Sequence, residues 1–280
     1  MMDPQFAAFE AAAGGRFAIA GEIGRGPRAV VYRARDVVRN DTVAIKILHS
    51  DLASALDTGH FLREMAHAQE VVHPGIVPLL GATEIAGRLV CITPYLQGET
   101  LRARLERERR LPLSDAVAIT RQVADALRYA HERDMLHKDV KPENIFLSGT
   151  RALLMDLGFS RAITRSMEET HTGTGLTLGT PAYMSPEHAS GGVEIDARAD
   201  LYSLGCVFYE MLAGEPPFTG ATPQAVWMRT LTDNPVSINV HRDSLPADVG
   251  LTIDRLLAKA PAARYADAGK VVDALATLGA

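Results

Sequence analysis

Residues 136 to 146 read LHKDVKPENIF and concentrate charged and polar side chains between apolar ones. Asp139, Lys141 and Asn144 alternate with Val140 and Ile145, which are typical core residues. Burying so many charges is costly unless each group has a partner. We therefore expect the segment to hold a carboxylate, an ammonium and an amide at the edge of a core, where a ligand supplies complementary charge.

A second acidic position follows in LLMDLGFS, where an apolar run ends at Asp156 before Gly158. A carboxylate and an amide at the ends of two adjacent strands can hold Mg²⁺, a hard cation that prefers oxygen ligands. Asp139 would then orient a hydroxyl group, and Lys141 would neutralise a phosphoryl group during transfer. A surface salt-bridge network is the alternative, but it does not explain the D-x-K-P-E-N spacing.

Two further segments are ambiguous by themselves. In IGRGPRAVVYRA, Gly24 and Gly26 lie between strand-like runs. Glycine lets the backbone approach a ligand, and exposed N–H groups can face phosphate oxygens, although hairpin turns use the same residues. Lys46 in VAIK is a lysine between apolar residues of a predicted strand, a position that is also typical of solvated lysines. Glu64 on the next predicted helix can pair with Lys46.

Composition narrows the class of protein. The chain has 280 residues, is 47% hydrophobic and carries a net charge of −5, which favours one large or two small domains and no nucleic-acid partner. Cys91 and Cys206 lie in apolar runs and are expected in the core, as in a reducing cytoplasm. No apolar run reaches the roughly 18 residues of a membrane span. A cytoplasmic chain without membrane contact is expected, which is compatible with an anchor in a longer parent protein.

The elements that must position these residues fall into two parts. Valine- and isoleucine-rich runs separated by turns predict strands in FAIAGEIG, AVVYRARDVV, DTVAIKIL and RLVCITPY. A helix over residues 55 to 71 interrupts them, with Phe61, Met65, Ala68 and Val72 along one face.

After PYLQGET the pattern becomes helical. Ser114 is expected to cap a helix whose apolar face is formed by Ala116, Ile119, Val123, Leu127 and Ala130. The run DLYSLGCVFYEMLAGEPPF is apolar nearly all round, as in a buried helix, and Gly214 with the prolines that follow ends it. A mostly β part therefore precedes a mostly α part, which indicates an α+β fold with two lobes and a cleft between them.

Taken in order, these motifs resemble the eukaryotic-like (Hanks-type) protein kinases, and within them the bacterial serine/threonine kinases. The resemblance runs from about Phe17 to Leu278 through GRGPRAVV, VAIK, HKDVKPEN, DLG, SPE, DLYSLG and the late Arg264. It implies a bilobal kinase fold with an N-terminal extension over 1–15 and a small, mostly β N-lobe with one helix over 16–93. A hinge over 94–98 and a larger, mostly α C-lobe over 99–280 follow, with the activation segment at 156–187.

The resemblance also implies roles in ATP-dependent phosphoryl transfer. Asp139 would orient the substrate hydroxyl, and Lys141 would stabilise the transferring group beside Thr180. Lys46, steadied by Glu64, would bind the α- and β-phosphates. Asn144 and Asp156 would hold Mg²⁺, with Mn²⁺ as a substitute. The nucleotide site as a whole would comprise Ile23, Gly24, Gly26, Val31, Ala44, Lys46, Thr93, Tyr95, Leu96 and Phe146.

In this family Lys141 and Thr180 accompany transfer to protein serine or threonine. The segment from Ser160 to Thr180 has little apolar periodicity and is expected to be mobile. Within it, Thr172 and Thr174 resemble an autophosphorylation pair, which implies transfer in trans within a transient kinase homodimer.

Several positions depart from the family pattern. Ala29 replaces a glycine, Pro27 stiffens the loop tip, Lys138 replaces an arginine and Leu157 replaces a phenylalanine, while Pro94 lacks an N–H group in the hinge. None of these changes removes a phosphate, metal or proton-handling group. They motivate the alternative of a pseudokinase that only binds nucleotide or docks partners. A small-molecule phosphotransferase is disfavoured by GTPAYMSPE and the threonine-rich segment.

Overall fold

The computed structural model describes residue 9 and residues 12–169, 180–191 and 195–278. The chain forms two compact units. Unit 1 comprises Met1–Val72, Val77–Gln97 and Gly158–Leu176, and unit 2 comprises His73–Ile76, Gly98–Leu157 and Thr177–Ala280. The single break expected at 94–98 is therefore incomplete, because short segments from each side of it belong to the other unit.

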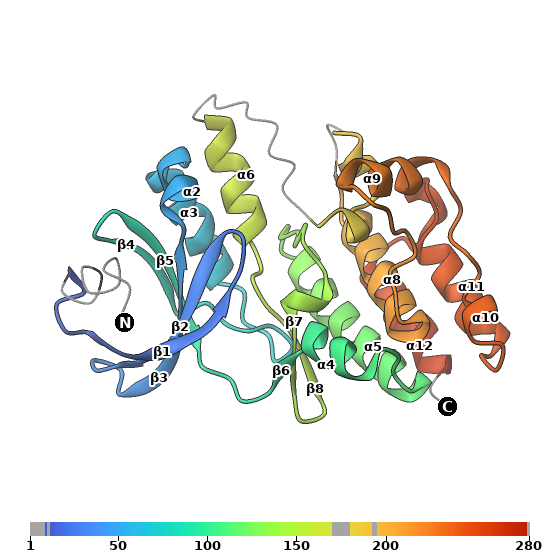
Figure 1. The fold of residues 1–280 in the computed structure, drawn as a ribbon, viewed down its shortest axis with the longest axis horizontal. Helices are drawn as coiled ribbons and strands as arrows, with labels where there is room; N and C mark the ends of the chain where they lie inside the picture. Colours follow the sequence, from blue (N-terminus) through green and yellow to red (C-terminus); the bar gives the residue numbers. More distant parts are fainter. Residues whose placement is uncertain (1–8, 10–11, 170–179, 192–194, 279–280) are drawn as a thin grey trace. The chain divides into compact units, whose positions relative to one another are not determined.

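Unit 1 is built on one antiparallel sheet with strand order β1-β2-β3-β5-β4 (Figure 1). Its strands are β1 (Phe17–Arg25), β2 (Ala29–Asp36), β3 (Asp41–Leu48), β4 (Gly81–Ile85) and β5 (Arg88–Pro94). Its helices are α2 (Ser50–Ala55), α3 (Thr58–Gln69) and α6 (Phe159–Glu169). The strands expected at β1, β2, β3 and β5 are confirmed, and β4 is an additional strand.

The alternation of side chains along β3 gives the sheet two different faces. Val43, Ile45 and Ile47 are buried in an apolar cluster with Val90 and Ile92 of β5. Ala44 and Lys46, between them in sequence, are only partly buried and point to the opposite face. One face of the sheet thus forms a core, while the other can carry functional groups.

Helix α3 follows the expected apolar stripe except at its end. Asp57 caps it by accepting a hydrogen bond from the His60 amide at 2.5 Å, and Phe61, Met65 and Ala68 are buried. The assignment of Val72 to this face was wrong. The helix ends at Gln69, and Val72 is 66% exposed beyond it.

The segment expected to be mobile from Ser160 contains helix α6, so that part of the expectation was wrong. Helix α6 packs against α3 within unit 1 (Figure 1). Phe159, Ala162, Ile163 and Met167 are buried, which is the spacing of an apolar helical face. Tertiary contact with α3 therefore stabilises a helix in a segment whose composition resembles a loop.

Unit 2 is mostly helical. Its short strands are β6 (Glu99–Thr100), β7 (Ile145–Ser148) and β8 (Arg151–Leu154), which pair in that order. Its helices are α4 (Leu101–Glu108), α5 (Leu113–His131), α7 (Pro186–Ala189), α8 (Arg198–Ala213), α9 (Pro223–Thr232), α10 (Ile238–His241), α11 (Ala247–Leu256) and α12 (Ala268–Leu278). Single 3₁₀ turns are η1 (Pro142–Asn144), η2 (Pro181–Tyr183) and η3 (Pro261–Ala263).

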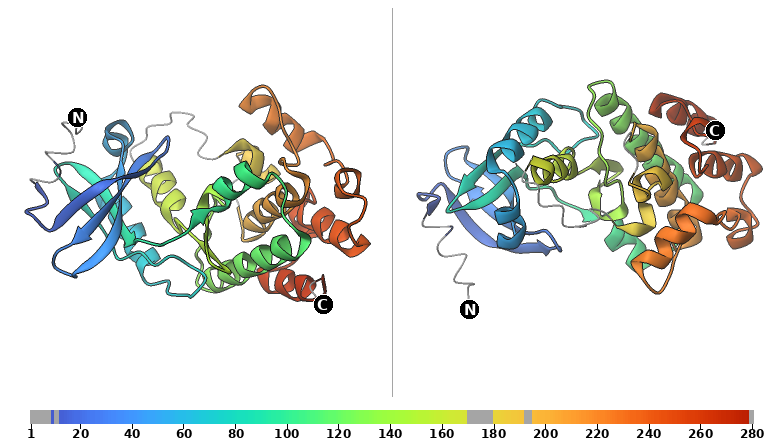
Figure 2. Two further views of the ribbon diagram at one scale, coloured as in Figure 1. Left: turned by 60° about the horizontal axis from the view of Figure 1, so that its bottom comes forward. Right: turned by 90° about the horizontal axis from the view of Figure 1, so that it is seen from above.

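Helices α5 and α8 form the centre of unit 2, and α12 packs against α5 (Figures 1 and 2). From Ala199 to Ala213 every residue of α8 is buried, as its all-round apolar sequence predicted. Gly214 ends the helix at φ 89°, a left-handed conformation that favours glycine. Among the described helices, none has the length and apolar character needed to cross a bilayer.

The expected apolar face of α5 is confirmed, but its cap is not. Ala116, Ile119, Val123, Leu127 and Ala130 are all buried. The helix begins at Leu113 with Pro112 as N-cap, so Ser114 lies inside the first turn. Its hydroxyl donates to the neighbouring Asp115 carboxylate at 3.5 Å instead of capping the backbone.

Candidate active site

The segment between α5 and β7 gathers three functional side chains. Lys141 Nζ donates to both carboxylate oxygens of Asp139, at 2.9 and 2.8 Å, and to Thr180 Oγ1 at 3.3 Å. Asn144 Nδ2 donates to the Asp139 carbonyl oxygen at 2.8 Å and to its carboxylate at 3.2 Å. The carboxylate, ammonium, amide and hydroxyl that the sequence suggested are therefore neighbours in unit 2.

Two buried residues, Asp200 and His137, hold this segment in place through hydrogen bonds. Asp200 of α8 accepts hydrogen bonds from the amides of His137 and Lys138 at 2.8 and 2.7 Å. The His137 ring lies within hydrogen-bonding distance of the Met155 carbonyl oxygen, at 2.7 Å, and accepts from the Asp139 amide at 3.2 Å. His137 is fully buried, so it supports the segment from the core of unit 2.

The charge of Asp200 is stabilised by its donors. Burial favours the neutral acid, but the hydrogen bond with His131 at 2.8 Å, the electrostatic influence of His131 and His137, and the hydrogen bond from the His137 amide together lower the pKa of Asp200. Lys138 has φ 62° and Asp156 has φ 59°, so both adopt the left-handed conformation that is uncommon outside glycine. The Asp200 contacts could not be predicted from the sequence, because the partners are more than sixty positions apart in the chain.

The oxygen donors proposed for a divalent cation lie at the same end of the β7–β8 hairpin. Asn144 directly precedes β7 and Asp156 follows β8, and the Met155 amide donates to the Asn144 carbonyl oxygen at 2.8 Å. The Asn144 side-chain nitrogen donates its hydrogen bonds to Asp139, so the side-chain oxygen is the atom that remains available to coordinate a cation. An amide and a carboxylate oxygen suit Mg²⁺. Within the described residues, no cluster of three or more His, Cys, Asp or Glu side chains forms a metal site.

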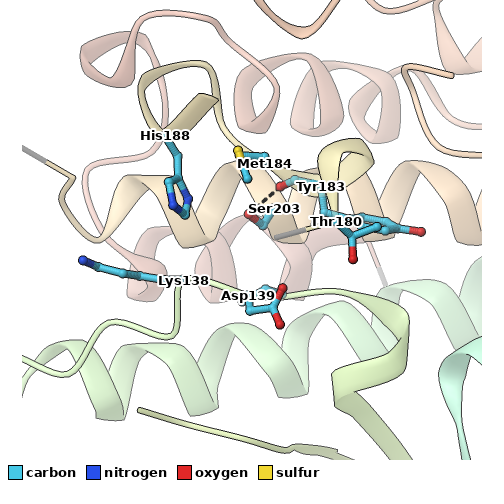
Figure 3. A pocket seen from close by; sticks show the side chains of 8 residues that line it. Lys138, Asp139, Thr180, Tyr183, Met184, His188 and Ser203 are labelled. Atoms are coloured by element: carbon cyan, nitrogen blue, oxygen red, sulfur yellow. Dashed lines mark hydrogen bonds between the residues drawn. The ribbon is translucent and has the colours of Figure 1, made fainter. Parts of the chain in front are cut away.

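A small pocket in unit 2 lies directly beside Asp139 (Figure 3). Its walls are formed by Lys138, Asp139, Val140, Thr180, Tyr183, Met184, His188 and Ser203. Figure 3 shows Asp139 and Thr180 on one side of it and Lys138 and His188 on the other. Burial and the nearby Lys138 charge lower the pKa of His188.

The nucleotide-binding residues expected from the sheet share one face of unit 1. Register pairs Val31 with both Gly24 and Lys46, and pairs Ala44 with Thr93. Directly paired residues of antiparallel strands project to the same side, so these side chains line one surface. Ile23 lies beside them at an irregularity of β1 and is 47% exposed. An apolar surface with one ammonium group is suited to an adenine nucleotide.

The remaining expected nucleotide contacts lie at the edges of this surface. The Gly26 amide closes its turn by donating to the Ala29 carbonyl oxygen at 2.9 Å. Tyr95 and Leu96 follow β5 and are half-buried. The Tyr95 amide donates to the Thr42 carbonyl oxygen at 3.1 Å, so it is not the donor to a base. Phe146 belongs to β7 of unit 2. That Phe146 and the unit 1 residues contact the same nucleotide stays a prediction.

Glu64 does not have the partner that the resemblance implied. Its carboxylate lies 3.0 Å from Arg161 Nε and accepts a hydrogen bond from Arg165 Nη1 at 2.8 Å. His60 Nε2 is 3.7 Å away. Burial favours the neutral acid, but the hydrogen bond from Arg165 and the charges of both arginines lower the pKa of Glu64. Within the described residues, the ion pairs of Glu64 are with these three side chains and not with Lys46.

Lys46 instead lies against an aromatic ring. Its Nζ is 3.8 Å from the centroid of the Phe159 ring, a cation–π contact. Pairing between Lys46 and Glu64 thus stays a prediction for another conformation.

Thr172 and Thr174 lie outside the described residues. Arg264 donates two hydrogen bonds to the Glu187 carboxylate of the SPE motif, both at 2.7 Å. Cys91 and Cys206 are buried thiols.

Comparison with known proteins gives one consistent result. Residues 17–273 match the family model described as protein kinase domain. Over 264 residues the chain is 37% identical to the serine/threonine-protein kinase PknB of Mycobacterium tuberculosis, covering 91% of this chain and 42% of that protein. It is 35% identical to a probable serine/threonine-protein kinase of Streptomyces coelicolor, covering 92% of this chain and 39% of that protein. The chain therefore spans less than half the length of these relatives.

Proposed function

Because the chain belongs to the protein kinase domain family, we propose that it transfers the γ-phosphoryl group of ATP to serine or threonine hydroxyls of proteins. The observation that carries this proposal is the contact of Lys141 with both Asp139 and Thr180. This arrangement places one positive charge between a carboxylate and a hydroxyl beside a pocket. It supports a non-specific serine/threonine protein kinase.

Each group has a task that follows from its chemistry. Asp139 accepts a hydrogen bond from the substrate hydroxyl, orients it for attack on the γ-phosphorus and takes up its proton as the bond between the γ-phosphorus and ADP breaks. Lys141 moves no proton; its charge stabilises negative charge that develops on the transferring oxygens. Thr180 holds the Lys141 ammonium at the pocket. Catalysis of this kind depends on positioning and electrostatics, so the hydrogen bonds around Asp139 directly affect the rate.

Asn144 and Asp156 would hold Mg²⁺ through their side-chain oxygens, and Mn²⁺ has compatible ligand preferences. When bound, the ion neutralises phosphate charge and helps orient the nucleotide. Lys46 would contact the phosphates from the sheet face that also carries Val31 and Ala44. The substrate serine or threonine would approach Asp139 at the pocket in unit 2, whereas the proposed roles of the unit 1 residues concern only the nucleotide.

We also propose that Thr172 and Thr174 are phosphorylated in trans, within a transient dimer of two copies of the chain. Their T-x-T pattern in a threonine-rich segment supports this proposal. Phosphorylated side chains carry about −1.5 to −2 charge each and would favour basic partners. Mass spectrometry of active enzyme should find both threonines phosphorylated. Active enzyme mixed with a catalytically inactive copy of the chain should phosphorylate the inactive copy. We place the enzyme in cytoplasmic signalling of a bacterium.

The central experiment incubates purified protein with labelled ATP and Mg²⁺, with Asp139→Asn as the control. Transfer should be seen with the wild type and should fall by about 10²–10⁴-fold in the variant. Acid hydrolysis of the product should release phosphoserine or phosphothreonine. Label only on tyrosine would contradict the proposed substrate class. Transfer no greater than in Asp139→Asn would favour the pseudokinase alternative, which nucleotide binding without turnover would then establish.

A further inference from the structure

Arg102, the second residue of α4, contacts side chains from three other segments of unit 2. Its Nε donates to Glu143 Oε1 at 2.8 Å, and its Nη1 donates to Glu210 Oε1 at 2.8 Å. Its Nη2 donates to the Tyr183 hydroxyl, which in turn donates to Glu210 Oε2 at 2.6 Å. One guanidinium therefore joins η1, η2 and α8.

Charge and burial explain why an arginine is required at this position. Glu210 and Tyr183 are each 4% exposed, and Glu143 adds a second carboxylate nearby. Burial opposes the charged form of Arg102, but its hydrogen bond with Glu210 and the surrounding charges raise its pKa. A planar guanidinium can serve several acceptors at fixed angles, whereas a lysine ammonium is a single point charge.

The contacts of Arg102 connect it to the reacting groups without touching them. Tyr183 forms part of the wall of the pocket that Asp139 and Thr180 also line (Figure 3). Glu143 is the direct neighbour of Asn144. Movement of Arg102 would therefore shift the pocket wall where a peptide approaches Asp139, while Asp139 and Lys141 keep their own hydrogen bonds.

We propose that Arg102 is a positioning residue that fixes Tyr183 in the wall of the protein-substrate pocket. This proposal rests on the proposed kinase function. Because Arg102 acts through the Tyr183 hydroxyl, its loss should weaken binding of the protein substrate and leave nucleotide binding and the chemical step largely intact. Sequence gave no sign of this role, since an arginine in LRARLERERR resembles an ordinary exposed helical charge.

Steady-state kinetics on the full chain test the link with Arg102→Lys, Tyr183→Phe and the double variant. We expect KM for a protein substrate to rise about tenfold in each, with kcat and KM for ATP within about twofold of the wild type. The double variant should be no worse than either single variant, because both remove the same link. Arg104→Lys is the matched control: Arg104 is on the same helix but pairs with Glu108 and Asp115 away from the pocket, and should change nothing.

Three results would overturn the proposal. One is a normal protein-substrate KM in Arg102→Lys, and another is a normal KM in Tyr183→Phe beside an impaired Arg102→Lys. The third is a melting temperature of Arg102→Lys so low that reduced folded fraction explains the whole loss. A wild type without any phosphoryl transfer would instead contradict the proposed function and would be recognised before the variants are compared.

Discussion

Lys141 Nζ lies 3.3 Å from Thr180 Oγ1 while it also donates to both carboxylate oxygens of Asp139. The two residues are separated by 39 positions in the chain, and their contact brings the segment around η2 to the segment around η1. The lysine is thereby held at the pocket by two anchors. The Lys141 side chain is only 15% exposed, which strengthens the electrostatic effect of its charge on neighbouring groups.

Thr180→Val should lower kcat, because it removes the hydroxyl that holds Lys141 without changing the volume of the side chain. A hydrogen bond to a charged group contributes about 1.5–3 kcal/mol, which corresponds to roughly tenfold or more in rate. Thr180→Ser keeps the hydroxyl and should retain most of the activity. Initial rates at saturating ATP and protein substrate measure the effect, and equal rates for Val and Ser would contradict the role of the hydroxyl.

Gly98→Ala should strongly destabilise unit 2. Gly98 has φ 143°, and a Cβ atom there would lie 2.0 Å from the Leu147 carbonyl oxygen. Backbone of β7 cannot move away without losing its pairing with β6, so the clash is not relieved by a side-chain rotation. Thermal melting should show a fall of several degrees, whereas Gly149→Ala, at φ 60° but in open space, should show a smaller fall. Similar melting temperatures for the two variants would contradict the steric explanation.

Asp200→Ala should destabilise the chain and abolish most activity together. The substitution leaves the buried amides of His137 and Lys138 without their acceptor, at a cost of about 1–3 kcal/mol for each orphaned donor. Chemical denaturation measures the loss of unfolding free energy. Asp196→Ala removes an exposed carboxylate near the start of the same helix and serves as the control. A small change in both stability and rate would refute the anchoring role of Asp200.

The pair of Glu187 with Arg264 should make stability depend on acid pH. Burial acts to raise the pKa of Glu187, but hydrogen bonding with Arg264 outweighs it and lowers the pKa below the usual 4.5. The ionised form is therefore favoured by folding, so the contribution is complete above about pH 4.5 and disappears as pH falls through the lower folded pKa. Breaking a buried pair costs about 3–5 kcal/mol.

Glu187→Gln provides the measurement for this pair. The difference in unfolding free energy between wild type and variant should be constant from neutral pH down to about pH 5, and should shrink at lower pH. Denaturant titrations at a series of pH values give the curve. A difference that grows on acidification would have the wrong sign for a carboxylate with a lowered pKa.

Asp156→Ala should weaken binding of the divalent ion rather than of the nucleotide base. The variant removes one of two proposed oxygen ligands, while Asn144 keeps its hydrogen bonds to Asp139. Mn²⁺ binding followed by electron paramagnetic resonance, with a nucleotide analogue present, gives a readout that does not depend on turnover. Chelation by EDTA should stop phosphoryl transfer in the wild type, and excess Mg²⁺ should restore it. Equal Mn²⁺ affinity in wild type and variant would exclude Asp156 as a ligand.

Local elements and the grouping of functional residues on short segments could be predicted from the sequence. Alternation distinguished the two faces of β3, apolar spacing identified the buried faces of α3 and α5, and the all-round apolar run identified α8 as a buried helix. The spacing of Asp139, Lys141 and Asn144 was enough to place them together, because neighbours within a tight turn cannot separate far. The errors at Val72 and Ser114 concern helix ends, where apolar spacing carries little information and capping geometry decides.

The distant partners of these residues depend on tertiary packing and could not be predicted from local sequence. Glu64 was expected beside Lys46, but α6 supplies two arginines from a segment that resembles a loop in sequence. The Asp200 anchor and the Arg102 network likewise join positions far apart in the chain. The physical reason is that a charged side chain or a helical turn can pair with many alternative partners at similar free energies. Packing selects among them, because buried charges are stable only where the rest of the fold supplies their counter-charges.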